Sequence, residues 1–154
     1  MRSAARGFSL IELMVVVAIA AIMAGIAVPS FKGFVSGQRV KTAASDFVMA
    51  AIFARSEAIK RNANVTITPA TGGASGWKDG WSVAVGGTEL GKQQAYSGLT
   101  FSGPSSAITY NGSGRLSAPV TTMTITGSDG STRCVVFDLS GMPRSTVSST
   151  GSCS

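Results

Sequence analysis

Hydrophobic residues dominate the first part of the chain. An apolar run extends from Phe8 to Val28, and the 19 residues from Leu13 to Phe31 carry no charge. As an α-helix rising about 1.5 Å per residue, this stretch covers most of the hydrocarbon core of a bilayer. The preceding residues include Arg2 and Arg6 and no acid, which places them on the cytoplasmic side. We therefore expect residues 8–31 to form one membrane-spanning helix.

After Pro29 the apolar positions recur every three or four residues, the spacing of a helix with one buried face. This pattern predicts that the helix continues to about residue 62, where Asn62 to Asn64 provide a stop. Charged side chains lie mostly off the stripe and are expected to face solvent, with Glu57 pairing to Arg61. The stripe consists of Val40, Ala44, Phe47, Ala51, Ala54 and Ala58, and the basic positions are Arg39, Lys41, Arg55, Lys60 and Arg61.

The rest of the chain is typical of short strands separated by glycine-rich turns, such as Gly86-Gly87 and Asn111-Gly112. Short spacings favour antiparallel hairpins packed against the amphipathic half of the helix. The expected fold is therefore α+β, a long N-terminal helix packed on an antiparallel β-sheet head that spans residues 32–154. The expected strands are Val65 to Thr68, Trp81 to Val85, Leu99 to Ser102, Ile108 to Tyr110, Thr122 to Thr126 and Cys134 to Leu139.

Composition adds two constraints. The formal net charge of +6 is compatible with anionic partners such as DNA or lipid headgroups, but does not choose between them. Cys134 and Cys153 are the only two cysteines and there is no histidine, so in a chain that is exported we expect a disulfide rather than a metal site. The bridge would hold the polar tail from Ser145 to Ser154 against the strand containing Cys134.

Glu12 is the one charged residue inside the N-terminal apolar run. A carboxylate at this depth costs a few kcal/mol unless it finds a partner. If the chain is cut between Gly7 and Phe8, Glu12 becomes the fifth residue of the mature protein and can interact with the new α-amino group of a neighbouring subunit. An ordinary secretory signal, cut after its apolar core, does not explain this charge.

The heptapeptide Gly7-Phe8-Ser9-Leu10-Ile11-Glu12-Leu13 resembles the type III signal of type IV pilins and type II secretion pseudopilins. The resemblance extends from residue 1 to about residue 31. It implies a leader of residues 1–7 removed by a prepilin peptidase, N-methylation of Phe8, and a role for Glu12 in subunit assembly. Pro29 matches the proline that kinks the helix in this family. The head would face the periplasm from the inner membrane and later form part of a surface pilus or a periplasmic pseudopilus.

Among pilin-like proteins, the chain most resembles the GspH/FimT group. Residues 54–61, Ala-Arg-Ser-Glu-Ala-Ile-Lys-Arg, match the group's signature at the end of the long helix. Asp79-Gly80-Trp81 resembles its early strand, and Gly114 and Gly141 fall where its members carry glycine-centred turns. The resemblance implies a minor type IV pilin near the filament tip that supports assembly with other major and minor pilins. An H-type pseudopilin of a type II secretion system remains the alternative.

A third possibility is DNA binding and uptake in natural transformation. FimT proteins of competent bacteria are understood to bind DNA through a glycine-arginine-any-arginine turn, which here falls on residues 141–144. Met142 replaces the first arginine, and only Arg144 remains. Arg133, Arg115 and Lys92 are expected to assist it, and clustered charges of this kind would give salt-sensitive, sequence-independent binding.

Catalysis finds no support in the sequence. Without histidine there is no Ser-His or Cys-His pair, and the seven carboxylates are scattered. No phosphate-binding loop of the Gly-x-x-x-x-Gly-Lys-Ser/Thr type occurs. We expect no enzyme activity, cofactor or metal. Trp77, Trp81 and Tyr96 offer a stacking surface for bases or sugars, although aromatic residues of strands more often fill the core.

Overall fold

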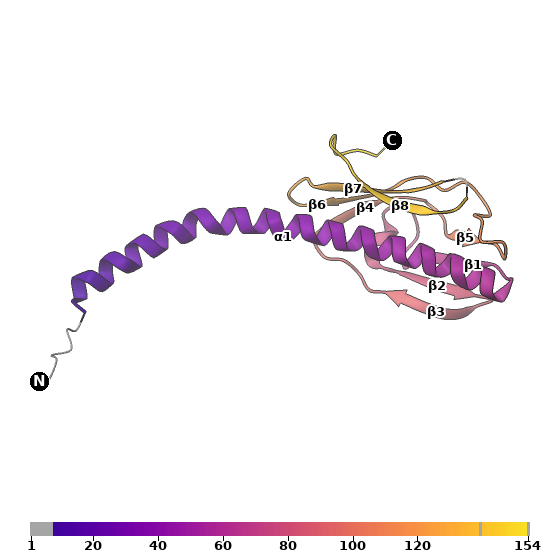
Figure 1. The fold of residues 1–154 in the computed structure, drawn as a ribbon, viewed down its shortest axis with the longest axis horizontal. Helices are drawn as coiled ribbons and strands as arrows, with labels where there is room; N and C mark the ends of the chain where they lie inside the picture. Colours follow the sequence, from indigo (N-terminus) through magenta and orange to yellow (C-terminus); the bar gives the residue numbers. More distant parts are fainter. Residues whose placement is uncertain (1–7, 139, 154) are drawn as a thin grey trace, which may run out of the picture. The chain divides into compact units, whose positions relative to one another are not determined.

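The computed structural model describes residues 8–138 and 140–153, without the side chains of residues 26–30. One helix, α1, runs from Leu10 to Arg61. The chain divides into two compact units, the first ending at Phe34 and the second beginning at Val35. Gly7 lies outside the described residues. We describe each unit by itself (Figure 1).

The N-terminal part of α1 carries its apolar side chains on the outside. Phe8, Ile11 and Ile22 are all more than 60% exposed, and the other large apolar side chains between them are 49% to 76% exposed. The α-helix continues through Pro29, so the proline does not end it, and a kink at this position stays a prediction. Among the side chains that the structure describes in this region, no helical stretch is both long and apolar enough to cross a membrane.

The second part of α1 is the spine of the head. All six residues of the expected apolar stripe are buried, as is Ala43 next to them. Five of these seven are alanines, whose small side chains allow strands to approach the helix closely. The prediction of an amphipathic helix is confirmed, and the Glu57 carboxylate accepts the expected bond from Arg61 Nε at 2.6 Å.

The helix ends as its sequence predicts. Asn62 adopts a positive φ of 48°, its N–H donates to the Ile59 carbonyl, and the Ala63 N–H donates to the Ala58 carbonyl. These two bonds define a Schellman motif, in which a left-handed residue satisfies the last free carbonyls of a helix. Asparagine tolerates this backbone conformation better than most residues, which explains why the helix stops here.

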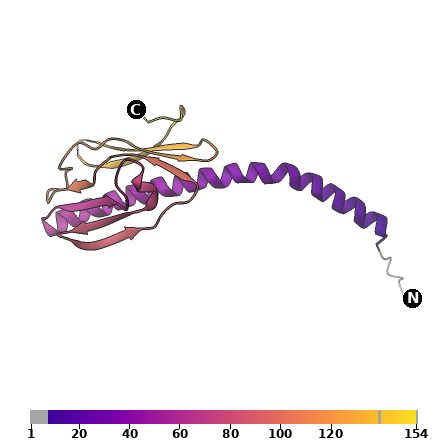
Figure 2. The ribbon, with the colours of Figure 1, turned by 180° about the vertical axis from the view of Figure 1, so that it is seen from behind.

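Two four-stranded antiparallel sheets form the head together with the helix. The first has the order β3-β2-β1-β5 and the second has the order β4-β6-β7-β8. In Figure 1, β2 and β3 of the first sheet are drawn below the helix and β4, β6 and β7 of the second sheet above it, and Figure 2 gives the view from behind. The first sheet consists of β1 (Val65–Pro69), β2 (Trp81–Val85), β3 (Thr88–Gln93) and β5 (Ile108–Tyr110), and the second of β4 (Leu99–Ser102), β6 (Met123–Gly127), β7 (Thr132–Phe137) and β8 (Pro143–Val147).

The expected α+β fold is confirmed, and all six expected strands are present within two residues at each end. Two strands were missed. The segment of β3 was assigned to no element, and β8 overlaps the start of the polar tail expected from Ser145 to Ser154. Both lie at the edge of a sheet, where few side chains are buried.

Aromatic rings fill the centre of the head. Phe47 of α1 meets Trp77 and Trp81 edge-on, with ring centroids 5.2 Å apart in each case. Trp77 lies on a short 3-10 helix, η1 (Gly76–Asp79), and its indole N–H donates to the Pro104 carbonyl at 2.8 Å. Both tryptophans are buried, so they are core residues and offer no stacking surface.

Candidate functional site

Two turns of the head have the same construction. In the first, Asn111 Oδ1 accepts hydrogen bonds from the Ser113 N–H, the Ser113 hydroxyl and the Arg115 N–H at 2.7 to 3.1 Å. In the second, Asp138 Oδ1 accepts the same three bonds from Ser140 and Met142 at 2.6 to 3.0 Å. The sequences Asn-Gly-Ser-Gly-Arg and Asp-Leu-Ser-Gly-Met therefore fold as equivalent Asx turns. We call them the paired turns.

The glycine of each paired turn has the backbone conformation that favours glycine, with φ of 73° at Gly114 and 81° at Gly141. The turns also touch. A Cβ atom on Gly141 would lie 3.3 Å from the Gly114 carbonyl oxygen and 3.1 Å from the ring of Tyr110. The Tyr110 hydroxyl donates to the Gly141 carbonyl at 2.8 Å, which fixes the second turn against β5.

Arg55 joins the helix to both turns. Its Nε donates to the Gly114 carbonyl at 2.8 Å, and its Nη1 lies 3.0 Å from the Met142 sulfur. The expectation that Arg55 belongs to a solvated face is wrong, because its guanidinium is engaged by segments 59 and 87 residues away. It positions the paired turns at the end of the head.

The carboxylate of Asp138 is held in its ionised form. Hydrogen bonds from the Ser140 hydroxyl and then from the Met142 N–H lower the pKa of Asp138, and the positive charge of Arg144 contributes. Arg144 is the exposed second residue of β8, and Arg115 is exposed at the end of the first turn. The paired turns therefore carry two exposed arginines beside one engaged arginine and one carboxylate.

The other two basic candidates lie elsewhere. In β7, Arg133 is opposite Val147, whereas Arg144 is opposite Val136. Since side chains alternate between faces along a strand, Arg133 and Arg144 point to opposite faces of their sheet. Lys92 lies on β3, at the far edge of the other sheet from β5, three strand spacings or roughly 14 Å away. The structure thus brings Arg115 near the turn before Arg144 and leaves Arg133 and Lys92 apart.

The N-terminal candidates lie at the start of α1. Glu12 Oε2 accepts a hydrogen bond from the Ser9 N–H at 3.3 Å. Ser9 precedes the first helical residue, so this bond is half of a Ser-x-x-Glu capping box. Phe8 is 79% exposed. The spacing Ser9-x-x-Glu12 is itself a signal for this local bond. From the sequence, we expected only a partner in another subunit.

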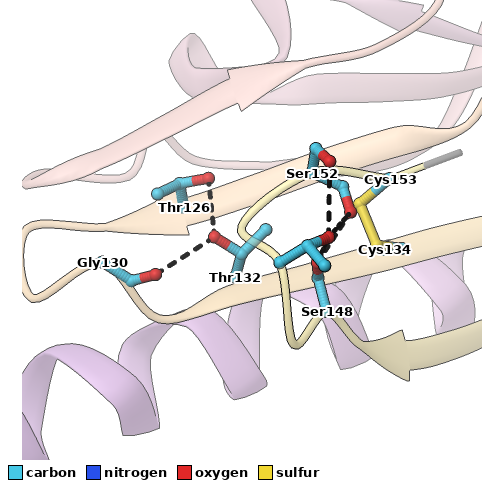
Figure 3. Close-up of a disulfide and its surroundings, with 8 residues drawn as sticks. Thr126, Gly130, Thr132, Cys134, Ser148, Ser152 and Cys153 are labelled. Atoms are coloured by element: carbon cyan, nitrogen blue, oxygen red, sulfur yellow. Dashed lines mark hydrogen bonds between the residues drawn. A yellow bond between two sulfur atoms is a disulfide. The ribbon is translucent and has the colours of Figure 1, made fainter.

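Cys134 and Cys153 form a disulfide, with Cα atoms 5.6 Å apart. Figure 3 shows the C-terminal segment folded back onto β7, where the Ser148 hydroxyl donates to the Ser152 carbonyl at 2.6 Å. The expected link between the tail and the strand containing Cys134 is therefore present. Across the described residues, no group of three potential metal ligands occurs.

Two family models match the chain. Residues 43–141 match the type II transport protein GspH, and residues 2–28 match the prokaryotic N-terminal methylation motif. The first match covers both paired turns up to Gly141, and the second includes Phe8, Glu12 and the start of α1. No curated protein matches the chain.

Solved structures with the same fold include two crystal forms of the type IV minor pilin FimU of Pseudomonas aeruginosa. They are 23% and 22% identical, with TM-scores of 0.58 and 0.61, and cover 73% and 77% of this chain and 94% and 95% of FimU. The minor pseudopilin EpsH from the type 2 secretion system of Vibrio cholerae is 13% identical, with a TM-score of 0.55, 71% of this chain covered and 97% of EpsH.

Proposed function

The chain belongs to the family of the type II transport protein GspH, and from this membership we propose that it is a minor type IV pilin. It is a pilin-like structural protein and not an enzyme. In this proposal the N-terminal helix anchors it in the inner membrane, with the head in the periplasm, until it enters the pilus near its tip and supports assembly. A pseudopilin role in a type II secretion system is the alternative.

One observation carries the proposal. The N-terminal part of α1 exposes apolar side chains all around the helix, and a helix that is hydrophobic all round needs an apolar environment. A bilayer provides it before assembly, and the packed helices of a filament provide it afterwards. The match to the N-terminal methylation motif supports this passage of the helix from the membrane into a filament. A prepilin peptidase would cut after Gly7, and Phe8 would become the methylated N-terminus.

Glu12 provides the test. In the proposal its carboxylate guides the subunit into the filament by attracting the α-amino group of a neighbour. Replacing Glu12 with Ala should leave cleavage largely intact and reduce incorporation into sheared filaments at least tenfold, measured by quantitative immunoblotting against the membrane fraction. Glu89→Ala, which removes an exposed carboxylate of the head, is the matched control. Normal incorporation of Glu12→Ala would contradict the proposed role of the N-terminal helix.

DNA binding at the paired turns is a second candidate function, and one observation favours it. Arg115 occupies in the first turn the place that Met142 occupies in the second, so the surface has an exposed arginine near Arg144 despite the methionine. An exposed guanidinium group at the end of the first turn and another two residues after the second suit contact with successive phosphates of a DNA backbone. Arg55 would support this surface indirectly by holding both turns.

Titration of the purified segment of residues 32–154 with duplex DNA at low and moderate salt tests this candidate. Binding should weaken with salt, and Arg144→Ala and Arg115→Ala should each weaken it severalfold at low salt. Arg133→Ala and Lys92→Ala serve as controls of equal charge change and should have a smaller effect. No saturable binding at low salt, or equal losses in all four variants, would rule out a specific surface at the paired turns.

Experiment can also distinguish a role in a pilus from a role in a type II secretion system. A pilin should be recovered with sheared surface pili, whereas a pseudopilin should remain in the cell envelope and be required for export of secreted proteins. Deleting the gene and measuring both surface piliation and the secreted protein fraction distinguishes the two machines. Loss of secretion with normal piliation would replace the pilin proposal by the pseudopilin alternative.

A further inference from the structure

Arg133 has no part in the paired turns, and its surroundings are unusual for a guanidinium group. It is partly buried on β7, opposite Ile125 of β6 and Val147 of β8. Ile125 is fully buried, so Arg133 points to the core-facing side of the sheet. None of the ion pairs in the described part of the chain includes it. Val147, its neighbour at the edge of the sheet, is exposed. Arginine side chains commonly bury their stem and leave the guanidinium head accessible, so this head is available to an anion.

A hollow of about 270 Å³ adjoins Arg133. It is bounded by Gly37 and Val40 of α1 on one side and by the ends of β7 and β8 on the other. Thr132, Ser148 and Ser149 also line it. The Thr132 hydroxyl donates to the Gly130 carbonyl and the Ser148 hydroxyl to the Ser152 carbonyl, so Ser149 is the residue of the three whose hydroxyl can serve a bound group. The volume corresponds to about nine water molecules at roughly 30 Å³ each, so it admits a group of several heavy atoms.

On the helix side of the wall, Gly37 lies near a carboxylate. A Cβ atom on Gly37 would approach only Asp129 Oδ2, at 3.7 Å, and the Ser131 hydroxyl, at 3.8 Å. The Asp129 carboxylate is engaged, because hydrogen bonds from the hydroxyls of Ser131 and Ser36 lower its pKa. Two charges thus lie near the hollow. The guanidinium group of Arg133 is on β7, and the Asp129 carboxylate is on the turn between β6 and β7.

This charge arrangement selects among anions. A guanidinium group binds phosphate oxygens with two parallel hydrogen bonds, and the Ser149 hydroxyl in the wall can donate to a further oxygen. A nearby carboxylate disfavours a dianion more than a monoanion, since each additional negative charge is repelled. Phosphodiesters carry one negative charge, and zwitterionic ones add an ammonium group that the carboxylate attracts. Gly37 in the wall lies only six positions after Phe31, where the apolar segment ends. The hollow is therefore close in sequence to the segment that spans the membrane in the proposed precursor.

We propose that the hollow beside Arg133 binds a phosphodiester group, with Arg133 as its main ligand. The group can come from a phospholipid headgroup or from a free glycerophosphodiester. The lipid source rests on the membrane-inserted precursor of the proposed function, whereas the binding chemistry does not. The site is separate from the paired turns, because Arg133 and Arg144 lie on opposite faces of the sheet.

The test uses the full chain in a phosphate-free maltoside detergent. Glycerophosphoethanolamine, glycerophosphoglycerol and inorganic phosphate are titrated while amide resonances of Thr132 and Ser149 are followed by NMR. Both diesters should give saturable shifts and bind at least threefold more tightly than phosphate. Arg133→Gln should weaken diester binding at least tenfold, and Arg115→Gln, which removes an exposed arginine outside the hollow, should leave it unchanged. Absence of saturable shifts, or equal affinities in Arg133→Gln and the original chain, would overturn the proposal.

Two further arms identify the source. Native mass spectrometry of the chain released from nanodiscs should retain phosphatidylethanolamine or phosphatidylglycerol in the original chain and lose it in Arg133→Gln, which supports the headgroup; diester binding without lipid retention supports a free diester. A short oligonucleotide is added as a competitor. If it displaces the diester from the original chain and fails to bind to Arg133→Gln, the site binds nucleic acid, and both proposed sources are overturned. The incorporation of Glu12→Ala into filaments tests the proposed function, whereas diester binding by Arg133→Gln tests the hollow. Failure of one proposal can therefore be distinguished from failure of the other.

Discussion

Tyr96 and Tyr110 are the only tyrosines of the chain, and both have their hydroxyl groups committed inside the head. The Tyr96 hydroxyl donates to Asp46 Oδ2 at 2.7 Å, and its ring stacks on Trp81. The Tyr110 hydroxyl donates to the Gly141 carbonyl. Burial raises the pKa of both phenols, and the Asp46 carboxylate raises that of Tyr96 further. The Tyr96 hydroxyl therefore links α1 to the segment between β3 and β4, and the Tyr110 hydroxyl links the second turn to β5, only while each keeps its proton.

This arrangement predicts a loss of stability at high pH. In the unfolded chain both phenols ionise near pH 10, whereas in the folded head their raised pKa keeps them neutral. The folded state then binds more protons, so the free energy of unfolding is fully retained below about pH 10 and falls as the pH rises further. Urea unfolding between pH 8 and 11.5 measures this fall. Tyr96→Phe and Tyr110→Phe should each make it less steep, and an unchanged slope in both variants would contradict the prediction.

Single residues also show where prediction from sequence stopped. The buried stripe and the stop at Asn62 follow from local periodicity and backbone preference, and both were correct. The role of Arg55 does not follow from local patterns, because its acceptors at Gly114 and Met142 belong to segments far away in the sequence. Likewise the basic candidates separate into two faces and two sheets, and this depends on strand register rather than on residue type.

At the level of elements, the two missed strands have a common physical reason. The edge strands β3 and β8 have the sequences Thr-Glu-Leu-Gly-Lys-Gln and Pro-Arg-Ser-Thr-Val, with few of the β-branched and aromatic residues that mark buried strands. Proline at the start of a strand is tolerated at an edge. Their pairing is supported mainly by backbone hydrogen bonds to a neighbouring strand, which leave no mark in the sequence pattern. The edge strands β4 and β5 bury alternate residues, and they were predicted within two residues like the central strands.

The paired turns give a prediction for elements in contact. Gly141→Ala adds a Cβ atom that would meet both Tyr110 and the Gly114 carbonyl, in a backbone conformation that costs about 1 to 2 kcal/mol for a residue with a Cβ. Gly130→Ala is the matched control, because Gly130 has nearly the same φ, 83° against 81°, with nothing within 4 Å. Both variants should lower the free energy of unfolding, and Gly141→Ala by more.

Chemical denaturation of the two glycine variants measures this difference directly. Subtracting the loss in Gly130→Ala removes the backbone cost and leaves the contribution of contact between the turns. Equal losses would mean that the turns do not support each other. A larger loss in Gly130→Ala would contradict the packing at Gly141.

For the whole molecule, the disulfide joins the C-terminal segment to β7. Cys134 and Cys153 are 19 positions apart, and closing a loop of this length stabilises a domain by roughly 3 kcal/mol in the chain-entropy model. Replacing both cysteines by serine should lower the free energy of unfolding by about this amount, measured by urea unfolding under non-reducing conditions. Adding a reductant to the original chain should give the same result, and a head whose midpoint is insensitive to both changes would refute the prediction.

The family itself was predictable at this scale because the signal around Gly7 to Glu12 and the stretch of residues 54–61 are short and specific. What the sequence could not provide was the division of the head into two four-stranded sheets, since strand order depends on long-range pairing. It also could not reveal that the paired turns share one construction, because equivalence between distant turns becomes visible only in their hydrogen bonds.

The position of the disulfide also determines how the head responds to mechanical tension. A pull on the chain beyond Cys153 would, without the bridge, first peel β8 from the edge of its sheet, one hydrogen bond after another. With the bridge intact, the tension enters at Cys134 in β7, which pairs with a strand on each side. Rupture there requires many bonds to yield together, so a filament subunit built in this way resists unzipping from its C-terminal end.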